Sequence, residues 1–123
     1  MISLAAALLF VCVAVDSDTV DCRQQGSELV ERVRIPNADA PELFSPQCDA
    51  ERELAARATA FTRAWLAKGP VELVAYERER DRYNRRLAYI RRGAEDLGEV
   101  LVREKLARPW TGRREPWCGS EGR

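Results

Sequence analysis

Three carboxylates stand in predicted turns of this chain, where they could bind a metal ion. Asp18 follows a short polar turn between two apolar segments, and Asp39 and Glu42 follow the third such segment. Because sequential strands usually lie side by side, these turns could converge at one end of a sheet. Carboxylate oxygens on loops suit Ca²⁺ or Mg²⁺. The alternative is an ordinary turn, since Asp often accepts hydrogen bonds from its own backbone.

Two arginines could place positive charge beside such an ion. Arg34 lies between two apolar residues of a predicted strand, so alternation directs its side chain to the opposite face. Arg85 lies in a predicted turn, although a solvated surface is the alternative there, since seven arginines fall between residues 78 and 92. Guanidinium groups next to a carboxylate-bound metal would suit a phosphate ligand.

The composition of the 123 residues excludes several kinds of chemistry. Histidine is absent, which excludes Ser-His-Asp and Cys-His catalysis, histidine-bound metals and an imidazole general base. Of the 20 basic residues 18 are arginine, the type best suited to bidentate contacts with phosphate, although a GC-rich genome also raises the arginine content. The 20 acidic residues balance the charge, so net charge alone indicates no partner.

The elements that must position these residues follow the order βββ-α-ββ-α in a single domain. Apolar and β-branched runs predict five strands, at residues 11–15, 19–23, 29–35, 71–76 and 87–90. Helical spacing predicts a helix with Asp49 as its N-cap that ends at Gly69-Pro70, and a shorter helix over residues 97–106. An arginine-rich turn is predicted over residues 77–86. The order is that of an α+β fold, a five-stranded OB-fold β-barrel with a helix between the third and fourth strands.

The two ends of the chain bear on its processing. Residues 2–15 are apolar except for Ser3, and this run is too short to span a bilayer. We therefore expect no stable membrane span. Residues 1–9 are interpreted as the remnant of a leader or the start of the first strand, residues 10–110 as one domain, and residues 111–123 as a polar tail.

Four cysteines, Cys12, Cys22, Cys48 and Cys118, form an even set in a short chain with a leader-like start. Such a set suggests disulfides and a secreted or periplasmic protein, with three possible pairings. Cys12 and Cys22 lie five residues on either side of Ser17, so a hairpin centred on that turn would place them opposite each other. The alternative is four reduced thiols in a cytoplasmic protein.

Four short motifs occur in order along the chain: Asp-Ser-Asp-Thr at 16–19, Arg-x4-Asp-Ala-Pro-Glu at 34–42, Asp-Arg-Tyr-Asn-Arg-x-Leu-Ala-Tyr at 81–89 and Leu-Val-Arg-x2-Leu-Ala at 101–107. In this order and spacing they resemble the motifs of the thermonuclease family, the staphylococcal-nuclease-like domains. The resemblance covers about residues 10–110, and the end of the chain looks like that of short secreted bacterial members.

The resemblance implies an OB-fold nuclease that hydrolyses the phosphodiester bonds of DNA or RNA with Ca²⁺. By position, Asp18, Asp39 and the carbonyl of Ala40 would bind the ion. Glu42 would act through water, as the general base or to orient the attacking water. A carboxylate and a metal-polarised phosphate can generate the nucleophile without histidine.

The resemblance also assigns residues to the substrate. Arg34 and Arg85 would hold the phosphate and stabilise the pentacoordinate transition state. Tyr83 and Trp110 would stack on the bases, with Arg82 as a further contact to the substrate in the same turn. Nucleic acid is the expected partner, and we expect the protein to be a monomer.

The chain departs from the family pattern at several positions. Asn84 and Lys105 stand where the family usually has glycine, and Gly98 stands where it often has asparagine. Asparagine tolerates a left-handed backbone, whereas lysine at a helix C-terminus implies some strain. Pro36-Asn37 replaces apolar strand residues, which is expected to weaken the end of the third strand.

Most of the long C-terminal helix of the thermonuclease type is missing from this chain. A bridge between Cys48, which precedes the first predicted helix, and Cys118, near the chain end, would tie down the tail in its place. The resemblance therefore adds Cys48–Cys118 to the Cys12–Cys22 pair that the hairpin predicts.

An alternative interpretation is a catalytically inactive OB-fold module that binds nucleic acid or a protein partner. Inactive modules of the family have typically lost the acidic and arginine residues, and this chain keeps them: Asp18, Asp39, Glu42, Arg34 and Arg85. A third interpretation, a small disulfide-stabilised barrel without enzymatic role, predicts neither the two turn-borne carboxylate sites nor both arginines.

Overall fold

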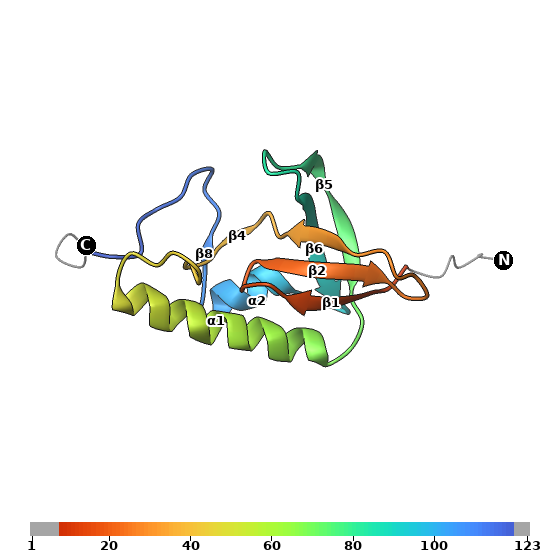
Figure 1. Cartoon of the computed structure of the whole chain (residues 1–123), viewed down its shortest axis with the longest axis horizontal. Helices are drawn as coiled ribbons and strands as arrows, with labels where there is room; N and C mark the ends of the chain where they lie inside the picture. Colours follow the sequence, from red (N-terminus) through yellow and green to blue (C-terminus); the bar gives the residue numbers. More distant parts are fainter. Residues whose placement is uncertain (1–7, 120–123) are drawn as a thin grey trace.

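The structure, a computed structural model, describes residues 8–119, which form a curved sheet with two helices (Figure 1). The elements in chain order are β1 (Phe10–Ala14), β2 (Thr19–Gln24), β3 (Glu31–Arg34), β4 (Ala38–Asp39), α1 (Asp49–Ala67), β5 (Glu72–Arg80), β6 (Arg86–Arg92), β7 (Glu95–Asp96), α2 (Leu97–Arg103) and β8 (Arg108–Pro109). The leader remnant predicted at residues 1–9 lies outside the described residues, apart from its last two positions.

The main sheet has the strand order β1-β2-β3-β6-β5, with β7 paired to β6. β1, β2 and β3 form the predicted antiparallel meander, and β3 then runs parallel to β6. A single antiparallel bridge between Phe10 and Val71 brings β1 close to the start of β5, although the barrel is not closed. The predicted α+β fold of the OB type is confirmed. In the chain, α1 follows β4 and precedes β5, as expected.

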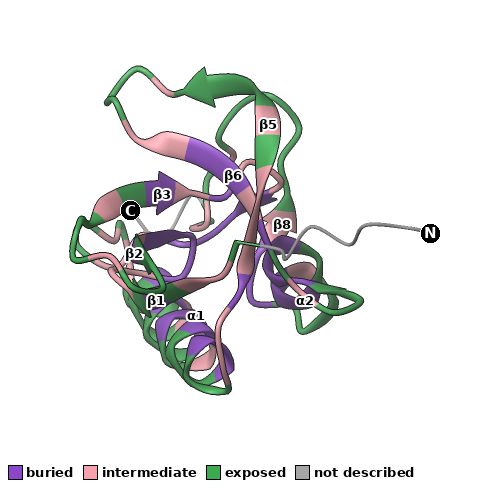
Figure 2. Cartoon of the chain, turned by 90° about the vertical axis from the view of Figure 1, so that its right-hand side faces the viewer, coloured by how far each residue is buried: buried purple, intermediate pink, exposed green. Residues whose placement is uncertain are grey.

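The hydrophobic core lies between the sheet and the two helices (Figure 2). α1 packs against β1 and α2 against β6. Among the largest fully buried side chains are Ile35, Ile90, Leu97 and Leu101, and burial of each such side chain contributes about 1.5–3 kcal/mol. This core fixes the start of β2, which follows Asp18, and the end of β3. Asp39 lies in the short strand β4 and not in the predicted turn.

The predicted N-cap of the first helix is wrong by one residue. The helix begins at Asp49, and Cys48 takes the cap position without a side-chain cap hydrogen bond. The buried carboxylate of Glu51 accepts hydrogen bonds from the backbone N–H groups of Gln47 at 2.8 Å and Glu42 at 2.9 Å. Glu51 therefore holds the loop that precedes the helix, and this loop carries the predicted general base.

The arginine-rich turn is shorter than predicted, because β5 continues to Arg80 and the turn comprises residues 81–85. Arg80 and Arg86 pair across the hairpin, and both form ion pairs with Glu31 of β3, at 2.7 and 3.3 Å. Like charges directly opposite each other are destabilising, and the ion pairs with Glu31 offset this repulsion.

Two departures from the family pattern compensate each other in space. The side-chain amide of Asn37 donates a 2.8 Å hydrogen bond to Asp96, the N-cap of α2. A Cβ atom at Gly98 would lie 2.1 Å from Oδ1 of Asn37, so the asparagine occupies the space that a side chain at position 98 would need.

Asn84 and Lys105 have φ angles of 64° and 61°, the left-handed backbone that the glycine of the family pattern favours.

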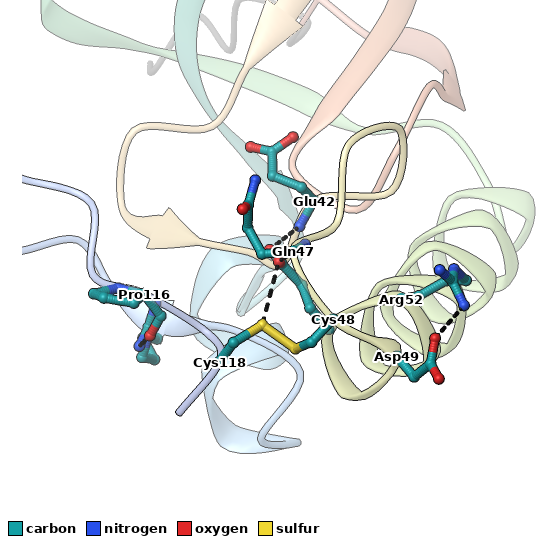
Figure 3. The surroundings of a disulfide bond; sticks show 9 residues. Glu42, Gln47, Cys48, Asp49, Arg52, Pro116 and Cys118 are labelled. Atoms are coloured by element: carbon teal, nitrogen blue, oxygen red, sulfur yellow. Dashed lines mark hydrogen bonds and ion pairs between the residues drawn. A yellow bond between two sulfur atoms is a disulfide. The ribbon is translucent and has the colours of Figure 1, made fainter. Parts of the chain in front are cut away.

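Both predicted disulfides are present. Cys12 and Cys22 are paired residues of the β1–β2 ladder, with a Cα–Cα distance of 4.1 Å. Cys48 and Cys118 join the start of α1 to the C-terminal tail over a sequence separation of 70 residues (Figure 3). The second bridge closes most of the domain into one loop.

Removal of the Cys48–Cys118 bridge is expected to lower the free energy of unfolding by about 4 kcal/mol, the loop-entropy value for a closure of this length. The double variant Cys48→Ser/Cys118→Ser is compared with the wild-type chain by urea unfolding. The same comparison in a reducing buffer is the control, because both chains then lack the bridge and should differ little. If the double variant is still about 4 kcal/mol less stable than the wild-type chain in the reducing buffer, the entropic explanation is contradicted.

Candidate active site

One cleft, with a cavity volume of about 560 Å³, lies between the β1–β2 turn, the end of β3, the β5–β6 turn and the C-terminal tail. Seven predicted site residues line it: Asp18, Arg34, Glu42, Arg82, Tyr83, Arg85 and Trp110. The other two, Asp39 and Ala40, are buried beside it. Residues from four separate parts of the chain therefore meet in one place.

Asp18 is the centre of a hydrogen-bond network that connects both predicted arginines. Its Oδ1 accepts a 3.2 Å hydrogen bond from the hydroxyl of Thr19, whose oxygen lies 3.5 Å from Nη1 of Arg85. Its Oδ2 lies 3.5 Å from Nη2 of Arg34 and accepts a 3.3 Å hydrogen bond from the backbone N–H of Ala40. The network joins the β1–β2 turn to the β5–β6 turn and to the loop after β4.

Arg34 is held at the end of β3 with its guanidinium group beside Asp18. Val33 and Ile35 on either side of it are fully buried, so the predicted alternation directs Arg34 to the other face. Its Nη1 donates to the carbonyl oxygens of Ala38, at 3.0 Å, and Ile35. These carbonyls fix the guanidinium group while one edge stays open to the cleft.

Arg85 is held by the first residue of its own turn. Its Nε donates to Oδ2 of Asp81 at 2.6 Å, and the backbone N–H groups of Arg85 and Tyr83 both donate to Oδ1 at 2.9 Å. Partial burial alone would raise the pKa of Asp81, but the hydrogen bonds and charge of Arg85 hold it below its usual value. Asp81 therefore stays ionised and keeps Arg85 in a defined position.

Tyr83 and Arg82 lie at the outer rim of the cleft. Two guanidinium groups lie over the ring of Tyr83, whose centroid is 5.0 Å from Cζ of Arg82 and 5.2 Å from Cζ of Arg85. Its side chain is exposed, and Trp110 from the segment after β8 is partly exposed on the same cleft. Flat, exposed aromatic rings can stack on nucleic-acid bases.

Asp39 and Ala40 present oxygen atoms that suit a hard cation. Oδ2 of Asp39 pairs with Nη2 of Arg108 at 3.3 Å, whereas its buried Oδ1 accepts no hydrogen bond from the described residues. With Asp18 and the Ala40 carbonyl, the donor set consists of two carboxylates and one carbonyl, which fits Ca²⁺. Residues 8–119 contain no cluster of three or more acidic, Cys or His side chains that could enclose a metal. Such an ion would depend on water and substrate for its remaining ligands.

Glu42 lies on the loop between β4 and α1 and lines the cleft. Its carboxylate points away from the nearby disulfide (Figure 3). Its backbone N–H is fixed by the hydrogen bond to Glu51. Its side chain forms an ion pair with Nη1 of Arg114. A carboxylate anchored through its own backbone can act on a water molecule without being a rigid metal ligand.

Four residues of the site were not singled out by the sequence analysis: Asp16, Glu51, Arg108 and Arg114. Asp16 lines the cleft, and its Oδ1 accepts hydrogen bonds from the backbone N–H groups of Asp18 at 3.1 Å and Thr19 at 2.9 Å. Burial and repulsion from Asp18 raise the pKa of Asp16 to about 7. Asp16 is the first residue of the Asp-Ser-Asp-Thr motif, which is the signal that could have found it, whereas no local pattern marks the other three.

The raised pKa of Asp16 predicts a pH-dependent stability in metal-free buffer. The carboxyl group ionises near pH 4 in the unfolded chain and near pH 7 in the folded one. The stability that it contributes is therefore present below pH 4 and is lost as the pH rises to about 7. Urea unfolding of the wild-type chain and of Asp16→Asn at several pH values isolates this contribution, because the stability of the wild-type chain relative to the variant should fall between pH 4 and pH 7. An unchanged pH dependence in the variant would contradict the prediction.

Comparisons with known proteins show which proteins this chain is similar to. The family model described as staphylococcal nuclease homologue matches residues 32–118. A thermonuclease of Staphylococcus hyicus is 33% identical over 94 residues, which are 76% of this chain and 54% of the relative. A thermonuclease of Staphylococcus intermedius is 36% identical over 95 residues, with the same two shares. The chain thus spans about half the length of these curated relatives.

Proposed function

Because the chain belongs to the staphylococcal nuclease homologue family, we propose that it is a Ca²⁺-dependent nuclease that hydrolyses phosphodiester bonds of DNA or RNA. The observation that supports this most directly is the network in which Asp18 connects Arg34 with the Thr19–Arg85 pair in one cleft. A solvated surface would not require these side chains to converge.

Asp18, Asp39 and the carbonyl oxygen of Ala40 would hold the ion. Oδ1 of Asp39 supports this assignment, because this buried oxygen accepts no hydrogen bond from the described residues and faces only Nη2 of Arg114, at 3.7 Å. A buried carboxylate oxygen so weakly satisfied is costly, and a cation would satisfy it. Bound Ca²⁺ would supply charge neutralisation at the scissile phosphate.

Glu42 would take the proton from the attacking water as a general base. The water oxygen would bond to phosphorus while its proton passes to the carboxylate, and the bond to the leaving oxygen would break, releasing an alkoxide that takes a proton from solvent water. Arg34 and Arg85 would donate hydrogen bonds to the non-bridging oxygens of the pentacoordinate transition state. Each such preorganised donor contributes roughly 2.7–4 kcal/mol. The carbonyls around Arg34 and the carboxylate of Asp81 support this role, since they orient both groups before the substrate arrives.

Arg82, Tyr83 and Trp110 would bind the substrate outside the reacting phosphate. The exposed aromatic rings would stack on bases, and base stacking tolerates any sequence. A nuclease with little sequence preference is the expected result.

The alternative is an inactive OB-fold module that binds nucleic acid or a protein. An inactive module would have no need to orient two arginines on a carboxylate, so the network does not favour it. Binding of single-stranded DNA in Ca²⁺ without hydrolysis is the observation that would support it.

The two disulfides support a secreted or periplasmic location, since such bonds persist in oxidising compartments. No helix within residues 8–119 is long and apolar enough to cross a membrane. We also propose that the protein is a monomer.

Hydrolysis of single-stranded DNA tests the proposed function. Turnover is expected in Ca²⁺, should stop when the Ca²⁺ is chelated, and should return when Ca²⁺ is added again. Mg²⁺ should support little turnover, because it demands a nearly ideal octahedral site. Equal activity in chelator would contradict the proposed metal dependence.

A further inference from the structure

A third arginine reaches the cleft from the C-terminal tail. Nη1 of Arg114 pairs with Oε1 of Glu42, and its Nη2 lies 3.5 Å from the carbonyl oxygen of Ala40 and 3.7 Å from Oδ1 of Asp39. These atoms belong to the proposed general base and to two of the proposed metal ligands. One guanidinium group therefore neutralises the acidic side of the site.

The tail is anchored immediately after Arg114. Arg108 donates to the backbone carbonyls of Glu115 at 2.5 Å and Pro116 at 3.1 Å, and its Cζ lies 3.7 Å from the ring centroid of Trp117. Cys118 is then bonded to Cys48 at the start of α1 (Figure 3). These contacts keep the side chain at position 114 within reach of the cleft even when it releases its present partners.

Arg114 and a metal ion would compete for the same oxygen atoms. Oδ1 of Asp39 and the carbonyl oxygen of Ala40 cannot face a guanidinium group and coordinate a cation at once. The side chain of Arg114 is half exposed, at 51%, so it can turn away from these atoms. The tail residues Trp110 and Gly112 line the cleft together with Arg34 and Arg85, and the released guanidinium would lie on this cleft.

We propose that Arg114 is a further substrate-positioning residue, which is the counter-ion of Asp39 and Glu42 in the metal-free protein and binds a nucleic-acid phosphate once the metal takes these oxygens. This inference rests on the proposed function. An arginine fork suits a phosphate group, and the anchored tail limits the entropy that is lost when the contact forms. Loss of Arg114 should therefore tighten metal binding and weaken substrate binding.

Calorimetric titration of the full chain with Ca²⁺, without nucleic acid, measures the first effect. Arg114→Ala should bind Ca²⁺ about three- to tenfold more tightly, the range expected for loss of a partly exposed ion pair. Arg113→Ala is the matched control, because Arg113 lines the same cleft from the same tail, is 80% exposed and, within residues 8–119, forms its ion pair with Glu115 and none with the proposed metal ligands. Its Ca²⁺ affinity should stay within about twofold of the wild-type value.

Steady-state hydrolysis of single-stranded DNA at saturating Ca²⁺ measures the second effect. Arg114→Ala should raise KM about three- to tenfold and leave kcat nearly unchanged, because the lost contact is to bound substrate. Arg114→Lys should keep a Ca²⁺ affinity near the wild-type value but show a raised KM, since a point charge can neutralise carboxylates but cannot form the bidentate contact.

Each result bears on the proposal. An unchanged Ca²⁺ affinity or an unchanged KM in Arg114→Ala overturns it, and so does an equal effect of Arg113→Ala, which would indicate a general effect of tail charge. A wild-type chain that binds Ca²⁺ and hydrolyses DNA while Arg114→Ala behaves identically overturns this inference alone. A wild-type chain that does neither overturns the proposed function and the inference together.

Discussion

Replacement of Arg34 or Arg85 with alanine is expected to lower kcat by roughly two to three orders of magnitude each, the effect of removing one preorganised donor to a developing negative charge. Lysine should restore little activity at either position, because it lacks the planar fork that binds two phosphate oxygens. The chain should remain folded, since both guanidinium groups lie at the cleft and outside the hydrophobic core. Initial rates on single-stranded DNA in saturating Ca²⁺ provide the measurement.

Arg82→Ala is the matched control for this prediction. Arg82 lies in the same turn, but its Nη2 donates to the hydroxyl of Tyr83, and within residues 8–119 no hydrogen bond connects Arg82 directly to Asp18 or Thr19. Its loss should affect substrate binding modestly. If Arg82→Ala lowers kcat as much as Arg85→Ala does, the position assigned to the reacting phosphate is wrong.

Glu42→Gln should lower kcat by about two to four orders of magnitude, the usual contribution of a general base. Binding of single-stranded DNA should be nearly unchanged, because glutamine keeps the shape of the side chain and the backbone N–H bond to Glu51 does not depend on it. Comparison of kcat with the dissociation constant from fluorescence anisotropy separates the two effects.

Glu115→Gln is the control for loss of a carboxylate charge near the site. Glu115 lies in the C-terminal tail, and its side chain pairs with Arg113. This variant should keep wild-type kcat. A Glu42→Gln variant with undiminished kcat would remove Glu42 from the proposed mechanism and leave another group to take the proton.

Local patterns of residue type determined much of the fold. The strands around Ser17 were predictable because a tight turn and a period of two residues together place Cys12 opposite Cys22. The same period directed Arg34 away from the core. The helix boundary was less predictable, since Glu51 stabilises the loop before α1 through backbone contacts that no pattern of apolar residues reveals.

The sequence by itself determined which residue types stand at the turns, and their resemblance to a known family indicated their roles. The tertiary structure decided which of them meet. Thr19 and Arg85 lie 66 residues apart, and Arg114 lies 74 residues from the carbonyl of Ala40 that it approaches. Such contacts depend on how the β5–β6 hairpin and the anchored tail pack against the β1–β2 turn. Local periodicity cannot specify them, because it reports only the face on which a side chain lies, whereas the partner on that face is set by the packing of the whole core.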